Sequence, residues 1–419
     1  MWGALRNPGF RWLWTGQVLS QLGNAIFLIM GLWEIQLKSP FLLSIAGLGM
    51  SLPSLLGVAG GVFADRYPPA RLMLGTDVLR GSAVLAGLFV VWWHPSWLIG
   101  VIIAVISIAS LGNALFGPSE LVVLTQLVPG DDLASANGLT AVTNQFAMAV
   151  GAGIGGAAIA TIGVKLIFGM DMVAYWLSAS ALLLMVRWLI RTKPALPITT
   201  PTEMKPPEPS SESFGQSLKN GWQGLKSMPW FMALIAPVVV SNFAFMAAFT
   251  MLPYWMRHVL HAGPAAFGLA DGGWSLGLLA GSLLSGVVGR YSLRKSVGIL
   301  NLVTSLFSVG FILAGNSWLA ASMLLLAGVA NGLVNALFLT FIQKIVPQNL
   351  LGRVMGLIMT LFGLATPLGT MAAGVSLHVL PLSWAWILGA VAAIPVTYMI
   401  LTRVPELPTP IPASEGQTV

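Results

Sequence analysis

Five charged residues lie close together in a part of the sequence that is otherwise almost purely apolar. Asp65, Arg66 and Arg71 follow a long uncharged run, and Asp77 and Arg80 lie inside the next one. Charges placed inside a membrane segment are costly and usually functional. Asp77 and Arg80 are three residues apart, so in a helix they share a face, and paired charges cost far less in an apolar medium than single ones. We interpret the five as one charge network; the alternative, that they only fix orientation, is weaker because acidic residues contribute little to orientation.

Three further carboxylates lie in or beside apolar runs, and they are the candidates for carrying a proton. Asp271 is the one charged residue between His261 and Arg290, and Asp171 and Glu34 also belong to apolar segments. Desolvation drives an isolated carboxylate in such a segment towards its neutral, protonated form. We place Asp271 first, although a helix-terminal cap is an alternative for it, and an interfacial position is an alternative for Glu34.

Amide side chains form a second polar set within the apolar runs. Gln17, Gln21 and Asn24 follow one another at i, i+4 and i+7, so they share one face of a helix. Amides that face lipid are costly, so this face should look into the protein or into water. Helix-to-helix hydrogen bonds are the alternative to a substrate pathway. The amides expected to line a central cavity are Gln17, Gln21, Asn24, Asn113, Asn242, Asn331 and Asn335.

The composition identifies the elements that position these residues as membrane helices. Hydrophobic residues make up 56% of the 419 positions and charged residues 8%, against roughly 25% in soluble domains. About 20 apolar residues cross the hydrocarbon core as a helix, and the long uncharged runs lack the alternation of a barrel. We therefore predict an all-α membrane protein with twelve transmembrane helices, at 12–36, 40–64, 72–93, 97–118, 135–161, 166–190, 229–254, 265–289, 294–314, 317–341, 353–377 and 382–402.

The distribution of Lys and Arg predicts the orientation of the chain. Basic residues concentrate in alternate loops, those on the same side as the two termini, which places both termini in the cytoplasm under the positive-inside rule. Because these Lys and Arg residues are distributed over several loops and form no single patch, the net charge of +7 does not indicate nucleic-acid binding. The chain has no cysteine, which excludes disulfides and thiolate metal sites.

The second half of the chain repeats the first. A shift of 218 residues pairs Asn113 with Asn331 and Gly151 with Gly369, among other positions. Two pseudo-symmetric six-helix halves related as parallel repeats are typical of transporters that rock around a central site. The expected organisation is a first half at 1–191, a cytoplasmic linker with an amphipathic helix at 192–228, a second half at 229–403 and a disordered tail at 404–419.

Four segments together resemble the major facilitator superfamily, and within it the drug:proton antiporter branch that includes macrolide efflux proteins. They are GGVFADRYPPARLMLGTDVLRG at 60–81, LVPGDDLASANGL at 127–139, FGMDMVAYWLSA at 168–179 and KIVPQNLLGRVMGL at 344–357. The resemblance implies the twelve-helix major facilitator fold. It also implies that Asp65 acts in gating, with Arg66, Arg71, Asp77 and Arg80 as its network.

The resulting expectation is a secondary active exporter in the cell membrane that moves amphipathic drugs or related small molecules, in exchange for protons. We expect a multi-pass monomer in the lipid bilayer, with no cofactor and no metal. Export of a dedicated lipid or siderophore is the alternative within the same fold, and a receptor or scaffold is the alternative outside transport. No combination of nucleophile, base and orienting group supports an enzyme, because all four histidines fall in or near outer loops.

Overall fold

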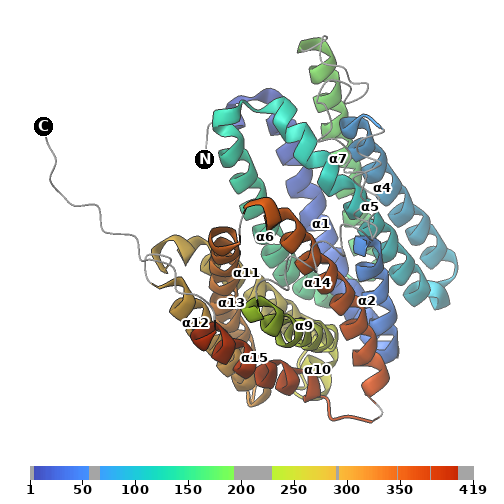
Figure 1. Cartoon of the computed structure of the whole chain (residues 1–419). Coiled ribbons are helices and arrows are strands. Elements are labelled where there is room, and N and C mark those ends of the chain that lie inside the picture. Colours follow the sequence, from blue (N-terminus) through green and yellow to red (C-terminus); the bar gives the residue numbers. More distant parts are fainter. Residues whose placement is uncertain are drawn as a thin grey trace, which may run out of the picture.

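A computed structural model gives the structure of the chain and describes residues 4–55, 67–192, 229–288, 292–346, 348–377 and 379–403. These residues form helices and connecting turns, with no strand among them (Figure 1). The first set of helices is α1 (Pro8–Lys38), α2 (Pro40–Leu55), α4 (Pro69–Trp93), α5 (Leu98–Leu127), α6 (Gly130–Thr161) and α7 (Val164–Thr192). The second set is α9 (Pro229–Thr250), α10 (Leu252–His258), α11 (Pro264–Val288), α12 (Leu293–Ile312), α13 (Ser317–Ile345), α14 (Gln348–Ser376) and α15 (Trp384–Thr402).

The all-helical membrane fold expected from the sequence is confirmed. Nine helices of the described residues are long and apolar enough to cross a membrane. Twelve of the helices in this part of the chain are long and lie at the predicted places, and α10 is a short addition where the seventh predicted helix breaks after Thr250. The expected linker at 192–228, apart from Thr192, and the expected tail at 404–419 lie outside the described residues.

One predicted boundary was wrong in a way that matters for the site. We expected the fourth helix to end at residue 118, but α5 continues through Pro118 to Leu127. Proline removes one backbone donor, and membrane helices tolerate it because nearby groups satisfy the freed carbonyls. Pro118 frees the carbonyl of Ala114, and beside it the Ser119 hydroxyl donates to the carbonyl of Leu115 at 2.9 Å. Glu120 therefore lies two turns inside a helix and not in a loop.

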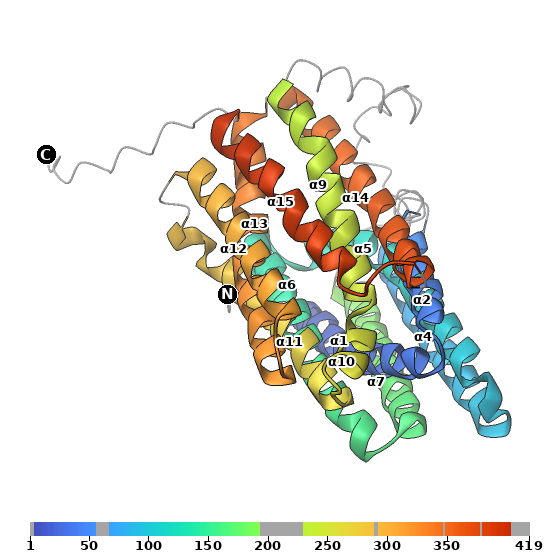
Figure 2. The ribbon, with the colours of Figure 1, turned by 90° about the horizontal axis from the view of Figure 1, so that it is seen from below.

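The helices pack mainly within their own set. In the first set α1 packs against α7 and α6, and α4 packs against α7 and α5; in the second, α11 and α12 pack against α13, and α9 packs against α14 and α15. Figure 2 shows the two sets as neighbouring bundles. Two helix pairs make most of the contact between them, α6 with α11 and α2 with α14, and α1 adds smaller contacts to α10 and α11, as α2 does to α9.

Both of these main pairs meet at glycines, with backbone against backbone at α6–α11 and with glycine against a Thr or Ser side chain at α2–α14. A Cβ built on Gly156 of α6 would lie 2.5 Å from the carbonyl oxygen of Pro264, and one on Gly268 of α11 would clash with the carbonyl oxygen of Ala152. Small residues let membrane helices approach this closely. We call this α6–α11 contact, formed by Ala149, Ala152, Gly156, Gly268 and Gly272, the glycine seam.

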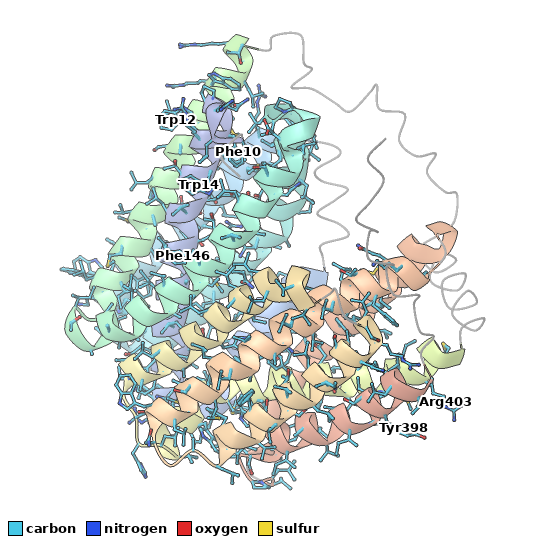
Figure 3. All side chains as sticks on the ribbon, turned by 90° about the vertical axis from the view of Figure 1, so that its left-hand side faces the viewer. Phe10, Trp12, Trp14, Phe146, Tyr398 and Arg403 are labelled. Carbon is cyan, nitrogen blue, oxygen red and sulfur yellow. The ribbon has the colours of Figure 1, made fainter. Side chains whose placement is uncertain are left out.

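The contacts between the two sets concentrate at one end of the bundle. The residues of the glycine seam belong to the second half of α6 and the first half of α11, and Gly47 of α2 meets Thr370 near the end of α14. This is the end opposite to the start of α1 and the end of α15, and we call it the far side; the other end is the terminal side. On the terminal side the sets diverge, and Phe10 and Arg403 lie at widely separated places in Figure 3.

The far-side contact can be tested by cross-linking, because the chain contains no native cysteine. A Cβ at Gly47 would lie 2.9 Å from the Cβ of Thr370, so a small separation of α2 and α14 brings two cysteines to the roughly 3.5 to 4.5 Å of a disulfide. We expect Gly47→Cys/Thr370→Cys to cross-link under mild oxidation, measured by gel mobility. The pair Trp12→Cys/Arg403→Cys is the control and should stay reduced; failure of the first pair to cross-link would contradict the far-side contact.

Candidate functional site

The first candidate site is a buried ion pair on α4. Arg80 Nη1 lies 3.1 Å from Asp77 Oδ1, and the side chains are 4% and 0% exposed. The two residues occupy adjacent turns of one helix, as their spacing predicted. It is the one ion pair recorded in the part of the chain that the structure describes. Breaking such a buried pair would leave an uncompensated charge in an apolar interior.

Side chains from neighbouring helices make hydrogen bonds and aromatic contacts to this pair. Ser178 on α7 donates a hydrogen bond to Asp77 Oδ2 at 2.6 Å, and Arg80 Nη2 donates to Asn113 Oδ1 on α5 at 2.9 Å. The guanidinium also lies over the rings of Phe116 and Tyr175, with centroids 5.4 and 5.7 Å from Cζ. Aromatic faces stabilise a desolvated cation. Arg80 thereby joins α4 to α5 and α7.

A second carboxylate lies within the field of the same arginine. Asp171 on α7 is 1% exposed and interacts electrostatically with Arg80. Its Oδ1 has no hydrogen-bond partner among the described residues. Two carboxylates, Asp77 and Asp171, thus share one guanidinium, so the cluster has one negative charge in excess if both are ionised. A proton on Asp171 would remove that excess.

Asp271 lies in the other set of helices, next to the glycine seam. Its helix neighbours Gly268 and Gly272 both face α6, where a Cβ at Gly272 would lie 2.6 Å from the carbonyl oxygen of Ala149. Phe267, one turn away, stacks on Trp33 of α1 with ring centroids 6.0 Å apart. The Asp271 side chain is partly buried. The carboxylate therefore lies where α11 meets the first set of helices.

The remaining charged candidates are spread over the molecule. Glu34 lies on the last two turns of α1 with Lys38 one turn further on, and it is partly buried. Arg71 lies in the first turn of α4 and is exposed. Asp65 and Arg66 lie outside the described residues. The structure therefore brings together Asp77, Arg80 and Asp171, but places Asp271 and Glu34 on other helices.

The amides predicted to line a cavity lie on α1, α5, α9 and α13. Several bond to protein groups: Asn24 accepts from the Tyr175 hydroxyl at 3.2 Å, Asn335 donates to Asn331 at 2.8 Å, and Asn242 donates to the Phe362 carbonyl at 3.4 Å. Asn113 is exposed and bonds Arg80, which places it at the edge of the buried charge cluster. Gln17 is 2% exposed and Gln21 is partly buried.

Sequence reasoning missed one polar residue, Glu120 on α5. It is partly buried and interacts with the Gln17 side chain on α1. The predicted end of the fourth helix at residue 118 leaves Glu120 in the loop that follows. The signal that could have found it is the apolar run Leu121–Leu124, which continues the helix for another turn.

The structural role of the buried pair gives a stability prediction. Arg80→Gln should lower the free energy of unfolding by about 3 kcal/mol, because it leaves the buried Asp77 without its partner. Asp77→Asn/Arg80→Gln removes both charges and should recover a large part of that loss. Thermal unfolding in detergent, followed by tryptophan fluorescence, measures both. A double variant less stable than Arg80→Gln would contradict the pairing.

Comparisons with known proteins agree with this arrangement. The family model described as Major Facilitator Superfamily matches residues 13–370 and 238–418. Macrolide efflux protein A of Streptococcus pyogenes is 24% identical, over 86% of this chain and 87% of that protein. Multidrug efflux pump Tap of Mycobacterium tuberculosis is 26% identical, over 88% of this chain and 87% of that protein.

The fold agrees with that of a solved transporter structure. A bacterial homologue of the iron transporter ferroportin, in an inward-facing state, aligns with a TM-score of 0.64 at 16% identity, over 94% of this chain and 98% of that one. The family match, the apolar helices and their arrangement in two bundles lead to one conclusion. The chain belongs to the Major Facilitator Superfamily and is a multi-pass membrane transporter of small molecules, not an enzyme.

Proposed function

We propose that the protein exports amphipathic drugs or related small molecules across the cell membrane in exchange for protons, by rocking its two helix sets. The observation that carries the proposal is the contact pattern between the sets, which are joined on the far side and diverge on the terminal side. Alternating access requires this arrangement and a second one, in which the sets are joined on the terminal side and separated on the far side. With both termini in the cytoplasm, this structure is open to the cell interior.

The direction and the substrate class are inferred from relatives and from the pathway. Two relatives that align over more than four fifths of the chain are named as efflux proteins, one for macrolides and one for multiple drugs. Amides on α1, α5, α9 and α13 supply polar groups among apolar walls. Pockets that combine mostly apolar lining with a few polar groups suit amphipathic ligands. The protein is proposed to work as a monomer.

We assign proton coupling to Asp271 ahead of Asp171 and Glu34. A coupling carboxylate has to sense the rocking movement, and Asp271 lies beside Gly268 and Gly272, which contact the opposite set of helices. Burial favours the neutral carboxyl, and opening of the seam on the far side would let Asp271 load a proton from the outside, which it would release inside the cell when drug or a basic neighbour arrives. Asp171 is enclosed within the first set and is placed to adjust the charge of the Arg80 cluster.

Drug susceptibility tests the proposed direction and substrate class. Cells that express the protein should tolerate several-fold higher concentrations of macrolides or other amphipathic drugs than cells with an empty vector. They should also accumulate less drug, because export lowers its internal concentration. Equal susceptibility across a broad drug panel, with the protein present in the membrane, would contradict drug export.

Transport in proteoliposomes tests the proton coupling. An imposed pH gradient should drive drug movement by the wild-type protein, and Asp271→Asn should lose the response to the gradient while still binding drug. Asp171→Asn is the matched comparison, since it neutralises a buried carboxylate away from the seam. Full gradient-driven transport by Asp271→Asn, or wild-type transport that ignores the gradient, would contradict the assignment.

A further inference from the structure

We propose that Gln36 sets the balance between the two forms of the transporter, because its side-chain amide is unpaired when the far side is closed and reaches water when the far side opens. This inference rests on the rocking movement of the proposed function and names a residue that controls it. The unpaired amide opposes the closed form and so eases the step that opens the transporter to the outside.

The Gln36 amide is buried without a hydrogen-bond partner. Gln36 lies in the last turn of α1 and is 2% exposed. Neither its Oε1 nor its Nε2 has a hydrogen-bond partner among the described residues, and no other side-chain amide there has both atoms in this condition. A side-chain amide can make up to four hydrogen bonds, and buried polar groups normally make at least one. The closed far side therefore holds Gln36 in an unfavourable state.

The helical repeat directs Gln36 towards the contact between the two helix sets. It lies two turns after Ile29 and one turn after Trp33, so the three residues share one side of α1. The Cβ of Ile29 is 3.2 Å from a Cβ built on Gly155 of α6, and Trp33 stacks on Phe267 of α11. The second set contacts α1 through α10 and α11. Gln36 is therefore buried where α1 meets the second set on the far side.

Gln36 also lies close to the end of the membrane segment. Leu37 and Lys38, the last two residues of α1, are exposed. When the sets separate on the far side, α10 and α11 move away from α1, and water reaches this turn of the helix first. The amide then forms the hydrogen bonds that it lacks in the closed form. Its free energy therefore differs between the two forms, which is the condition for a group to shift their populations.

Gln36 and the glycine seam act in opposite directions. The seam favours the closed far side, because the close packing of α6 on α11 is lost when the sets separate. An unpaired buried polar group costs enough to change an equilibrium about tenfold. A transporter that alternates has to populate both forms, so a group that offsets part of the stabilisation by the seam keeps the closed form from becoming a trap. An apolar side chain in place of Gln36 would remove this offset.

Spin-label distances across the far side measure the balance directly, in full-length protein in lipid nanodiscs. Labels are attached at Trp97→Cys in the first set and Leu313→Cys in the second, at far-side positions that are 66% and 77% exposed, and the chain has no native cysteine. Gln36→Met removes the amide at nearly constant size, and we expect it to lower the ratio of open to closed distances about tenfold. The same change should raise the midpoint of thermal unfolding. Leu37→Met, at the adjacent exposed position, is the control and should leave both unchanged.

The distances are also measured with Gly156→Ala added to each variant. The new methyl group would press on the carbonyl oxygen of Pro264, which lies 2.5 Å from a Cβ built on Gly156, and so would weaken the closed form. The open distance should become more populated in this background. A tenfold decrease on adding Gln36→Met can then be measured.

The sign of the change separates the alternatives. A lower midpoint of thermal unfolding with a larger open population for Gln36→Met would show that the amide is paired in the closed form and holds it together, which overturns the inference. An unchanged ratio would show that the amide has no effect on the balance and would also overturn the inference, while the rocking movement stands. A single distance for every variant, Gly156→Ala included, would contradict the rocking movement itself, and the inference fails with the proposed function.

Discussion

The structure depends on one constraint, the exclusion of water from the interior of the helix bundle. The Asp77–Arg80 pair shows its effect, because two charges buried there must be paired and hydrogen-bonded. The two residues pair with each other within α4, and their other hydrogen bonds and aromatic contacts come from α5 and α7, which both pack on α4. In water such a pair would contribute little, but in an apolar interior it fixes which faces of α4, α5 and α7 meet. Close contacts of α4 at Gly81 with α7 and at Gly87 with α5 act together with these polar groups to specify the arrangement.

The interiors of the two sets of helices are packed with different kinds of side chain. Within the described residues the first set contains the buried charges on α4 and α7, whereas the second set relies on aromatic clusters such as Phe249, Trp274 and Trp386, with ring centroids about 5 to 6 Å apart. The sequence repeat that relates the halves preserves glycines and amides but not this charge cluster. The interiors of the two halves are therefore held together by different kinds of interaction.

Much of the fold followed from the sequence, because a run of about 20 apolar residues has few alternatives to a membrane helix. The predicted helices agree with the observed ones, and the Asp77–Arg80 pairing followed from local spacing alone. The end of α5 was predicted too early: Pro118 breaks helices in water but is tolerated between packed membrane helices, and the apolar run Leu121–Leu124 beyond it was the signal for continuation. The meeting of Asp171 with Arg80, and of Glu120 with Gln17, depends on the rotation and depth of separate helices. Neither is encoded in any local pattern.

The glycine seam has a mechanical consequence. Its surfaces are mostly backbone, so they have no long side chains that must change rotamer before the helices can part. The work of opening is then mainly lost dispersion contact, which has a short range and falls away after a small displacement. The first small separation of α6 and α11 therefore costs most of the work, and further separation costs little. The seam behaves as a latch, and water that enters the gap reaches Asp271 only after the helices have begun to separate.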